Sequence, residues 1–298
     1  MIQDIAPCVF SNEYSASLPC DDDPVFAIHA ARVLVRIAHA SSEQAPDSAS
    51  EGPVNRIALP SAADVWFEGN NATLMPIRLF SIDDQSYYLA FPVERESEPL
   101  ELSGFEWIRA RTLMAAEPIH VRLAISTALQ LSEWYDTNRM CGRCGTPMAR
   151  SAKHRVLECP TCENSVYPRI NPAVIVAVRY EDSLLMIKYA GPDAYRHRAL
   201  IAGFCEIGET AEQTVAREVM EEAGVHVKNI RYVTSQPWGF ASDLLLGFVC
   251  DLDGSPEIHR DDEELSYAEW VPRESIFEED DQVSLTRHLI AAFKRGDL

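Results

Sequence analysis

The sequence predicts an α+β protein of three parts: an N-terminal α/β domain at residues 1–135, a four-cysteine module at 136–168 and a C-terminal domain at 169–298. Three observations support this fold class. Apolar runs typical of strands recur on both sides of a central segment that holds two CxxC pairs. An acidic segment with the start and stop signals of a helix lies among the C-terminal strands. A length of 298 residues accommodates two domains and a small module.

The N-terminal domain is expected to combine strands with one helix. Its strand-like runs are Ala30–His39, Val65–Phe67, Leu74–Phe80 and Tyr87–Phe91. A polar, proline-bearing segment at 41–53 predicts an exposed loop. Pro118–Tyr135 predicts a helix, because its apolar residues fall on one face. No group of residues in this domain forms a recognisable catalytic site.

Composition and charge exclude several classes of protein. With 47% hydrophobic and 24% charged residues, the chain is typical of soluble globular proteins. Its apolar runs are too short to span a membrane, and its start lacks the features of a signal peptide, so we expect a cytoplasmic protein with no membrane partner. A net charge of -20 argues against a general nucleic-acid-binding role, which needs a basic surface.

The central module is expected to hold structural Zn²⁺. Cys141 and Cys144 form one CxxC pair, and fourteen residues separate it from the pair Cys159 and Cys162. Such spacing presents four thiolates to one tetrahedral ion and leaves no open position for chemistry. A disulfide pair fits an intracellular chain less well, and a redox dithiol would leave the second pair unexplained.

The acidic segment predicts a helix that carries three carboxylates on one face. Thr210 and Gln213 have the spacing of a capping box, and Gly224 is a natural helix stop. The apolar stripe consists of Ala211, Val215, Val219 and Ala223. Between these signals, glutamates recur at i, i+3 and i+4, and their carboxylates leave the same side of the helix.

These three carboxylates are Glu218, Glu221 and Glu222, and Arg217 is placed to reach Glu221 and orient the set. Most acidic pairs of this kind are simply solvated. A cluster of like charges is nevertheless stabilised by a cation, and oxygen ligands suit Mg²⁺ or Mn²⁺.

The loop before the helix favours the metal site over a solvated acidic face. Gly203 and Gly208 flank four residues, Glu209 follows, and glycines there let the backbone approach a ligand closely. The whole pattern, from Gly203 through Glu209 and Arg217-Glu218 to Gly224, resembles the signature of the Nudix hydrolases. The resemblance implies metal-dependent hydrolysis of a nucleoside diphosphate linked to another moiety.

Further elements are expected around this helix. The predicted strands are Val174–Val178, Leu184–Ile187, Ala199–Phe204, His226–Val233, Leu244–Cys250 and Ala268–Val271, with a closing helix at Leu285–Phe293. Strands mixed with two helices fit the α/β/α sandwich that the Nudix resemblance implies.

A second motif narrows the family. The element SQPWGF, from Ser235 to Phe240, comes after the strand expected at His226–Val233 and lies ten residues beyond the acidic helix. It resembles the SQPWPFPxS element of the NADH pyrophosphatases. Those enzymes also carry a four-cysteine zinc module followed by a YPR segment, here Tyr167 to Arg169. The resemblance covers roughly residue 136 to the end. It implies a homodimer that cuts NADH or NAD to nicotinamide mononucleotide and AMP, and NAD-capped RNA shares the same pyrophosphate.

The resemblance also implies the residues of the site. The positions expected to surround the substrate are Tyr167, Phe204, Gln236, Trp238 and Phe240. Trp238 and Phe240 offer flat faces for stacking on a ring, although aromatic residues of a core are the ordinary alternative. A fourth metal-binding carboxylate is expected from the segment before Trp270, at Glu264 or alternatively Glu263.

Departures from the motif leave the substrate open. Gly239 and Ala241 stand where the family has proline, and Asp243 stands in place of a serine. Loss of two prolines predicts a more flexible loop. Hydrolysis of ADP-ribose or a diadenosine polyphosphate is therefore an alternative. A zinc-ribbon module that binds nucleic acid is another, because the ribbon itself is locally basic.

Overall fold

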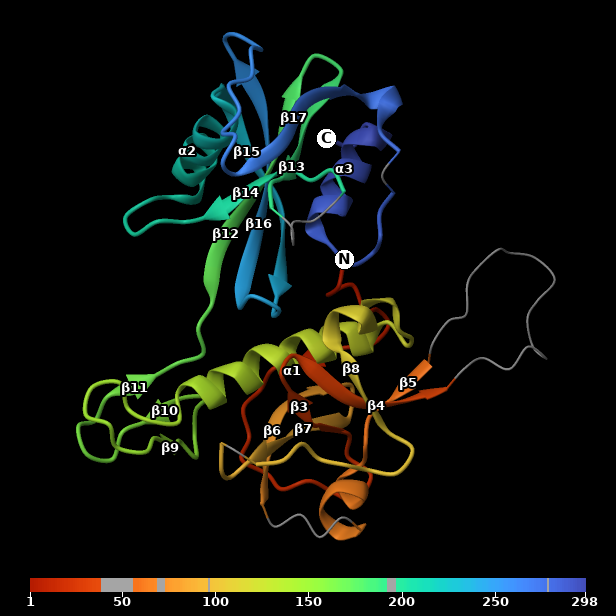
Figure 1. The fold of residues 1–298 in the computed structure, drawn as a ribbon, viewed down its shortest axis with the longest axis vertical. Helices are drawn as coiled ribbons and strands as arrows, with labels where there is room; N and C mark the ends of the chain where they lie inside the picture. Colours follow the sequence, from red (N-terminus) through yellow and green to blue (C-terminus); the bar gives the residue numbers. More distant parts are fainter. Residues whose placement is uncertain (39–55, 69–72, 96, 192–196, 278) are drawn as a thin grey trace, which may run out of the picture. The chain divides into compact units, whose positions relative to one another are not determined.

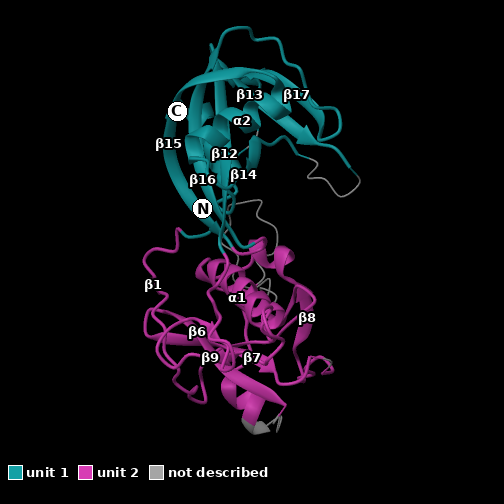
Figure 2. Ribbon diagram, turned by 90° about the vertical axis from the view of Figure 1, so that its left-hand side faces the viewer, with its two compact units in different colours: residues 1–3, 170–238, 242–298 teal, residues 4–169, 239–241 magenta. Residues whose placement is uncertain are grey.

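The computed structural model describes the chain except residues 39–55, 69–72, 96, 192–196 and 278. The loop expected at 41–53 lies outside the described residues. Two compact units are present (Figure 2): unit 1 comprises 1–3, 170–238 and 242–298, and unit 2 comprises 4–169 and 239–241. None of the described helices is both long enough and apolar enough to cross a membrane.

Unit 1 is built on one mixed sheet with the strand order β15-β16-β12-β13-β17, and β14 pairs with β12. Its strands are β12 (Asn171–Tyr180), β13 (Ser183–Tyr189), β14 (Ile201–Phe204), β15 (His226–Trp238), β16 (Asp243–Asp253) and β17 (Leu265–Pro272). Strands β12 and β16 run parallel, while the other pairs are antiparallel. A short 3-10 helix, η3 (Arg273–Ser275), follows β17.

Two helices cover opposite faces of this sheet (Figure 1). Alternate residues of β12 point to opposite sides. Val174 and Val176 belong to the core under α2 (Ala211–Ala223), whereas Ile175 belongs to the core under α3 (Leu285–Arg295). Each fully buried valine or leucine contributes on the order of 1.5–3 kcal/mol. The predicted α/β/α sandwich is confirmed.

One strand of unit 1 is longer than the sequence indicates. The prediction ends at Val233, but β15 continues to Trp238, pairing Gln236 with Leu245 and Trp238 with Asp243. The expectation that the SQPW segment follows a strand is therefore wrong. Hydrogen bonding to β16 outweighs the low strand propensity of Pro237, whose missing N–H is tolerated in an outer strand.

The described part of unit 2 contains two four-stranded sheets, a long helix and the cysteine module, whose strands form a three-stranded sheet of the order β11-β10-β9. One sheet has the order β1-β6-β7-β2, and the other joins β3, β4 and β5, with β8 on β4. The strands are β1 (Phe10–Ser11), β2 (Val25–Phe26), β3 (Ile28–His29), β4 (Arg32–Ala38), β5 (Arg56–Ala58), β6 (Leu74–Ile82), β7 (Gln85–Pro92) and β8 (Glu106–Arg109). The 3-10 helix η2 (Ala110–Ala115) leads to α1 (His120–Thr137), and the module carries β9 (Ala149–Arg150), β10 (Leu157–Glu158) and β11 (Ser165–Val166). The predictions of β4, β6, β7 and α1 are confirmed.

The strand predicted at Val65–Phe67 is wrong, since Ala63–Glu68 forms a short π-helix, η1. Its start is fixed by a reciprocal contact. The Ser61 backbone N–H and hydroxyl both donate to the Asp64 carboxylate at 2.8 Å, and the Asp64 N–H donates to the Ser61 hydroxyl at 3.2 Å. This local capping by side chains overrides the strand propensity of the three apolar residues.

Candidate active site

Helix α2 is fixed at both ends by the residues that predicted it. The Thr210 N–H donates to the Gln213 side-chain oxygen at 2.8 Å, and the Gln213 N–H donates to the Thr210 hydroxyl at 3.3 Å. Gly224 ends the helix in the left-handed region, with φ of 68°. A Cβ on Gly224 would also lie 2.6 Å from that of His259. The acidic residues are thereby held on a helix of fixed length.

Arg217 is the centre of the acidic cluster. Its guanidinium donates to both oxygens of Glu209 at 2.7 and 2.9 Å, to Glu218 at 2.8 Å and to Glu221 at 2.9 Å. A fifth bond joins it to the carbonyl oxygen of Phe204 at 3.0 Å. These contacts lower the pKa of Glu209 to about 2, the hydrogen bonds from Arg217 being the main cause. Glu209 stands in the sequence motif, but its pairing with Arg217 could not be read from spacing alone.

Glu222 lies in a different environment from its neighbours. Its side chain is only 2% exposed, and one carboxylate oxygen has no hydrogen-bond partner among the described residues. Burial, reinforced by the charges of Glu218 and Glu264, raises the pKa of Glu222 to about 8. A buried carboxylate oxygen without a partner is costly, and a bound cation would relieve that cost.

Gly203 makes room for the second glutamate. A Cβ at this position would lie 2.0 Å from the carboxyl carbon of Glu218, so any larger residue in β14 would displace this carboxylate from its place. Burial raises the pKa of Glu218, and the contact with Arg217 opposes that effect. The strand glycine therefore fixes the space that the helix glutamate occupies.

The segment before β17 supplies further carboxylates. Glu264 is exposed, its backbone oxygen accepts a hydrogen bond from Ala190 N–H at 2.7 Å, and its charge raises the pKa of Glu222. Asp261 also raises this pKa, and its N–H donates to the Glu222 backbone oxygen at 3.0 Å. Sequence reasoning missed Asp261, because nothing in the linear spacing brings it to the end of α2.

Three of the expected substrate-binding side chains are accessible within their own units. Phe204, at the end of β14, is 54% exposed, and Tyr167, in unit 2, is 67% exposed. Trp238 is half-buried at the end of β15. Exposed aromatic side chains such as those of Phe204 and Tyr167 can contact a ligand ring.

Gln236 is engaged inside unit 1. Its side chain is fully buried, its nitrogen donates to the Val283 oxygen at 2.6 Å, and its oxygen accepts from the Leu285 N–H at 2.7 Å. The amide thus joins β15 to the first turn of α3. Both polar ends of the side chain are occupied by protein atoms.

Phe240 and Gly239 belong to unit 2. The Gly239 N–H donates to the Ser126 hydroxyl at 3.0 Å, and a Cβ on Gly239 would lie 2.0 Å from the Ser126 carbonyl oxygen. The guanidinium of Arg111 lies 5.2 Å from the centre of the Phe240 ring. Proline is excluded at residue 239 by this contact, which explains the departure from the family motif. Asp243 is likewise buried, and Asn171 donates to it at 3.4 Å.

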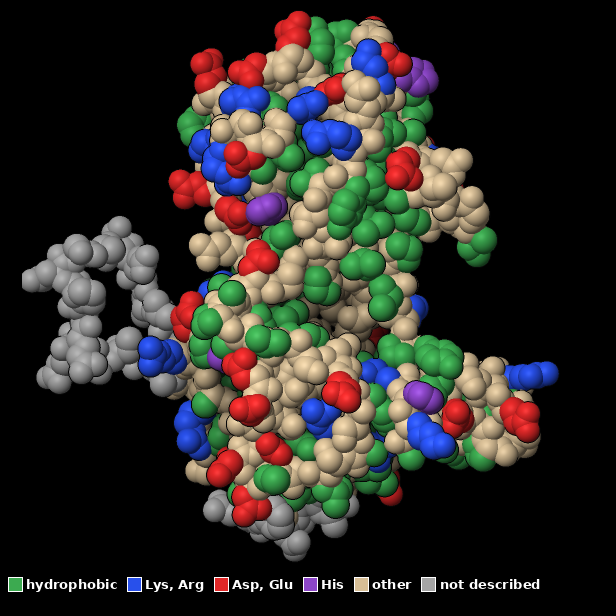
Figure 3. Space-filling view, turned by 180° about the vertical axis from the view of Figure 1, so that it is seen from behind, with side chains coloured by type: hydrophobic (Ala, Val, Ile, Leu, Met, Phe, Trp, Pro, Cys, Tyr) green, Lys and Arg blue, Asp and Glu red, His purple; other side chains and the backbone are tan. Residues whose placement is uncertain are grey.

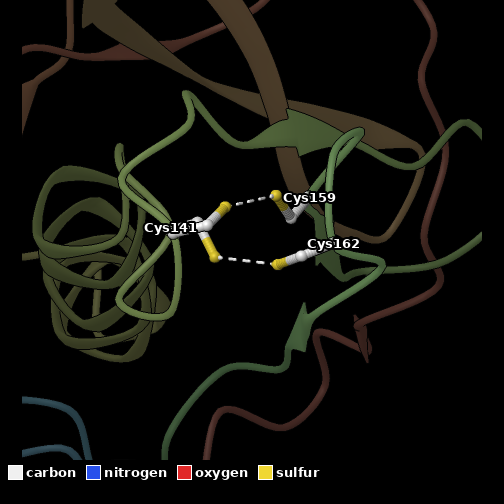
Figure 4. A group of neighbouring side chains, drawn as sticks. Cys141, Cys159 and Cys162 are labelled. Carbon is white, nitrogen blue, oxygen red and sulfur yellow. Dashed lines mark hydrogen bonds between the residues drawn. The ribbon is translucent and has the colours of Figure 1, made fainter.

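The four cysteines of the module meet at one point, and Figure 4 labels three of them, Cys141, Cys159 and Cys162. The Sγ atoms of Cys141 and Cys162 are 3.6 Å apart, those of Cys144 and Cys159 are 3.4 Å apart, and all four lie within 4.8 Å of one another. A tetrahedral zinc site, with Zn–S about 2.3 Å, needs sulfur atoms roughly 3.8 Å apart. Each of the eight cysteines, all of them described, is a free thiol. The donor set fits structural Zn²⁺ and not a disulfide pair.

In the described part of the chain, no other group of three or more cysteine, histidine or acidic side chains has ligand atoms this close together. The carboxylates of α2 are less closely gathered: Glu218 and Glu221 accept hydrogen bonds from Arg217, whereas Glu222 is buried.

Two basic residues of the ribbon face protein. Arg139 donates to the carbonyl oxygens of Pro92 and Val93 and lies over the Phe91 ring at 4.0 Å. Arg155 donates to Asn12 at 2.9 Å. Acidic and basic side chains are interspersed on the face drawn in Figure 3. These contacts favour a structural role for the ribbon over nucleic-acid binding.

Two protein families match this chain, one over the domain that carries the acidic helix and one over the four-cysteine module. Residues 169–293 match the family described as NUDIX domain, and residues 136–167 match the NADH pyrophosphatase zinc ribbon domain. The chain contains a Nudix domain. This Nudix domain spans the sandwich of unit 1, including α2, and the zinc ribbon precedes it directly.

Similar proteins include the "NAD-capped RNA hydrolase NudC" of Salmonella typhi and that of Salmonella heidelberg (strain SL476). Each is 47% identical over 146 residues, which is 48% of this chain and 54% of the relative. The chain thus spans about half the length of the curated relatives that it matches. A solved Nudix hydrolase from Nitrosomonas europaea is 22% identical, with a TM-score of 0.45, and the match covers 53% of this chain and 90% of that one.

Proposed function

We propose that this protein is a metal-dependent pyrophosphohydrolase that cleaves NADH and NAD to nicotinamide mononucleotide and AMP. The observation that carries the proposal is the carboxyl group of Glu222, which is buried on the acidic helix of the Nudix domain with one oxygen lacking a hydrogen-bond partner among the described residues. The name of the relatives, NAD-capped RNA hydrolase, supports a nicotinamide dinucleotide as substrate.

Glu218, Glu221, Glu222 and Glu264 are the proposed ligands of Mg²⁺ or Mn²⁺, because both ions prefer oxygen donors. The charge of Glu264 acts on Glu222, which favours Glu264 over Glu263 as the fourth ligand. When bound, the ion supplies charge neutralisation for the pyrophosphate oxygens and a lowered pKa for a neighbouring water. Arg217 holds Glu218 and Glu221 on one side of α2 and so limits the orientations that they can adopt.

The exposed aromatic side chains are the proposed contacts for the rings of the dinucleotide. Phe204 follows Gly203 directly, and its carbonyl oxygen accepts a hydrogen bond from Arg217 of α2. A substrate ring stacked on Phe204 would therefore lie near the acidic helix. Tyr167 and Trp238 are the further stacking residues. Stacking on an aromatic side chain contributes roughly 1–3 kcal/mol per base.

Gln236 and Phe240 are assigned different roles from those implied by the motif. Since protein atoms occupy both ends of the Gln236 amide, we assign it to holding β15 against α3. Phe240 lies against Arg111 in unit 2, and its place there, together with Gly239, anchors the altered loop. The altered loop does not by itself disfavour the dinucleotide.

The proposal extends to three wider properties. NAD-capped RNA presents the same pyrophosphate and nicotinamide as NAD, and the name of the relatives supports it as a second substrate. We also propose a homodimer in the cytoplasm. Sedimentation at working concentration would measure the mass of the assembly, and a monomer mass would contradict the dimer.

The test is a comparison of kcat/KM for NADH, NAD, ADP-ribose, diadenosine polyphosphates and NAD-capped RNA, each with Mg²⁺ or Mn²⁺. NADH or NAD should have the highest value. Glu222→Gln should lower kcat by about 10²-fold or more, because it removes a charged ligand from the site.

The matched control is Glu212→Gln, since Glu212 is an exposed glutamate in the first turn of the same helix. Its rate should stay within about twofold of the wild type. Near-wild-type rates for Glu222→Gln would contradict the proposed metal site. A tenfold advantage of ADP-ribose or a diadenosine compound would instead keep the site and replace the substrate.

A further inference from the structure

Unit 2 contains a cavity of about 920 Å³, and none of its lining residues belongs to the acidic helix α2. Its wall is formed by the turn between β3 and β4, the start of η2, the end of β7, one face of α1 and Phe240. The residues of α1 in this wall are Leu129, Ser132, Glu133 and Asp136, which share one face of the helix. Cavities of roughly 300–1,000 Å³ are the size that small ligands occupy.

Arginine dominates the charge of this cavity. Its cationic side chains are Arg32, Arg95, Arg109 and Arg111, against two carboxylates. One of these carboxylates, Asp136, is already paired with Arg139 at 2.8 Å, and Arg95 lies 3.7 Å from it. In a chain with a net charge of -20, the cavity is locally basic. Such a site attracts anions.

Two of the arginines stand directly opposite each other. Arg32 of β4 and Arg109 of β8 are cross-strand partners in the antiparallel pair. Like charges at directly opposed positions destabilise a sheet. Both side chains are exposed, and neither makes a hydrogen bond or ion pair with any described residue. An anion between the two guanidinium groups would relieve their repulsion and accept charge-assisted hydrogen bonds.

The wall also has apolar parts, which include a flat aromatic ring. Phe240 lies under the guanidinium of Arg111, at 5.2 Å, so a cation and an aromatic face stand side by side. Ala30 and Ala31 form the hairpin turn, with φ of 46° and 58°. Both central residues of such a turn need positive φ, which asparagine and glycine adopt with less strain. Alanine keeps this part of the wall small and apolar.

We propose that the cavity is a binding site for a nucleotide phosphate, with the phosphate between Arg32 and Arg109 and the base beside Phe240. This site consists of residues of unit 2 and lies outside the acidic helix. The nucleotide phosphate can belong either to a free mononucleotide or to a nucleotide of an RNA chain. The proposal does not depend on hydrolysis by the Nudix domain.

Calorimetric titration of the full-length zinc-loaded protein tests this site. The ligands are AMP, adenosine and a 5′-phosphorylated RNA hexamer, each without added Mg²⁺ or Mn²⁺. AMP or the hexamer should bind, and adenosine should bind at least about tenfold more weakly, because it lacks the group that arginine recognises. If AMP binds tightly, the natural ligand is a free nucleotide. If the hexamer binds tightly and AMP binds weakly, the natural ligand is RNA.

Substitutions in the cavity test whether the ligand binds there. The double variant Arg32→Ala and Arg109→Ala should weaken the tighter ligand by about tenfold or more. Arg56→Ala is the matched control, because Arg56 is an exposed strand arginine outside the cavity. The substitution Phe204→Ala, in the Nudix domain, should leave this affinity unchanged, which separates the cavity from binding of product at the acidic helix.

Rescue and folding complete the test. Arg32→Lys with Arg109→Lys should restore part of the affinity lost in the alanine variant, since the charge returns without the planar fork. Thermal unfolding establishes that each variant is folded. No binding of AMP or hexamer by the wild type, equal affinity in the double alanine variant, or loss of binding only in Phe204→Ala would each overturn the proposal. Hydrolysis of NADH, measured on the same samples, reports separately on the proposed function.

Discussion

Arg217 donates two parallel hydrogen bonds to the two carboxylate oxygens of Glu209, from eight positions further along the chain. This forked contact ties the loop after β14 to the middle of α2. The remaining guanidinium nitrogen holds Glu218 and Glu221. Only arginine offers this fixed planar arrangement of donors. The acidic helix is therefore organised by one cation of the protein itself.

Replacing Arg217 by lysine tests this arrangement. Lysine keeps the charge but is a point donor on a flexible stem, so Glu209, Glu218 and Glu221 lose their common partner. We expect kcat/KM for NADH to fall by about tenfold or more, because small displacements of catalytic groups are costly. The control is Arg295→Lys at the end of α3, where the arginine pairs with Asp297 on the surface. Equal kcat/KM in both variants would argue against the organising role.

Glu222 predicts a pH dependence of stability without added divalent ion. Its pKa is about 8 in the folded protein and about 4.5 in the unfolded chain. Between these values the folded state keeps a proton that the unfolded state has lost. Stability should therefore be highest below pH 4.5, as far as this group is concerned, and should fall as the pH rises to about 8.

Urea unfolding at pH 5 and pH 8 measures this effect. Wild type should lose on the order of a few kcal/mol more than Glu222→Gln over this interval, because glutamine cannot ionise. Adding Mg²⁺ at pH 8 should restore stability to the wild type and not to the variant. Identical pH profiles of the two proteins would show that Glu222 does not titrate in this range.

The contacts of Gly239 predict what happens when the proline of the family motif is restored. Gly239→Pro removes the N–H that donates to Ser126 and places a side chain against the Ser126 carbonyl oxygen, so we expect a loss of about 1–3 kcal/mol or more. Gly239→Ala should also destabilise the protein. Gly142→Ala is the control, since no atom of the described residues lies within 4 Å of the added Cβ. Chemical denaturation compares the three, and a stabilising proline would contradict the observed packing.

Zinc removal should destabilise unit 2. The ribbon residues Arg139 and Arg155 bind backbone and side-chain oxygens of the N-terminal domain, so loss of the ion should loosen contacts beyond the ribbon. Metal analysis should find about one zinc per chain, and Cys159→Ser should abolish it. Cys20→Ser serves as the control, because Cys20 is an exposed thiol outside the cluster. Retained zinc in Cys159→Ser would contradict the ligand set.

The parts of the fold that local chemistry determines were predictable from sequence. Helix α2 carries its own cap and stop, and the CxxC pairs fix the zinc site by spacing, so neither needs tertiary information. The strand predicted at Val65–Phe67 failed because Ser61 and Asp64 cap a helical turn there.

The contacts that could not be predicted join distant segments. Phe240 lies in unit 2 against Arg111. The side-chain oxygen of Gln236 accepts a hydrogen bond from the first residue of α3. Family resemblance assigns such residues by motif, but it carries no information about which protein atoms surround them. For the same reason Asp261 near Glu222 had no signal in the sequence.

The guanidinium of Arg217 has a consequence for how the molecule is assembled. Because it already neutralises carboxylates of α2, the acidic helix does not have to wait for a divalent ion before the sheet closes over it. Among the described residues, the contacts of the four cysteine sulfur atoms of the ribbon are with one another, with Thr146 and Asn164 and with backbone N–H, and not with a basic side chain. The protein is therefore expected to mature in two stages: zinc enters as the chain folds and stays, whereas the catalytic ion exchanges freely with the surroundings afterwards. Activity would then follow the supply of Mg²⁺ or Mn²⁺ from moment to moment, while the lifetime of the folded chain would follow the supply of zinc during synthesis.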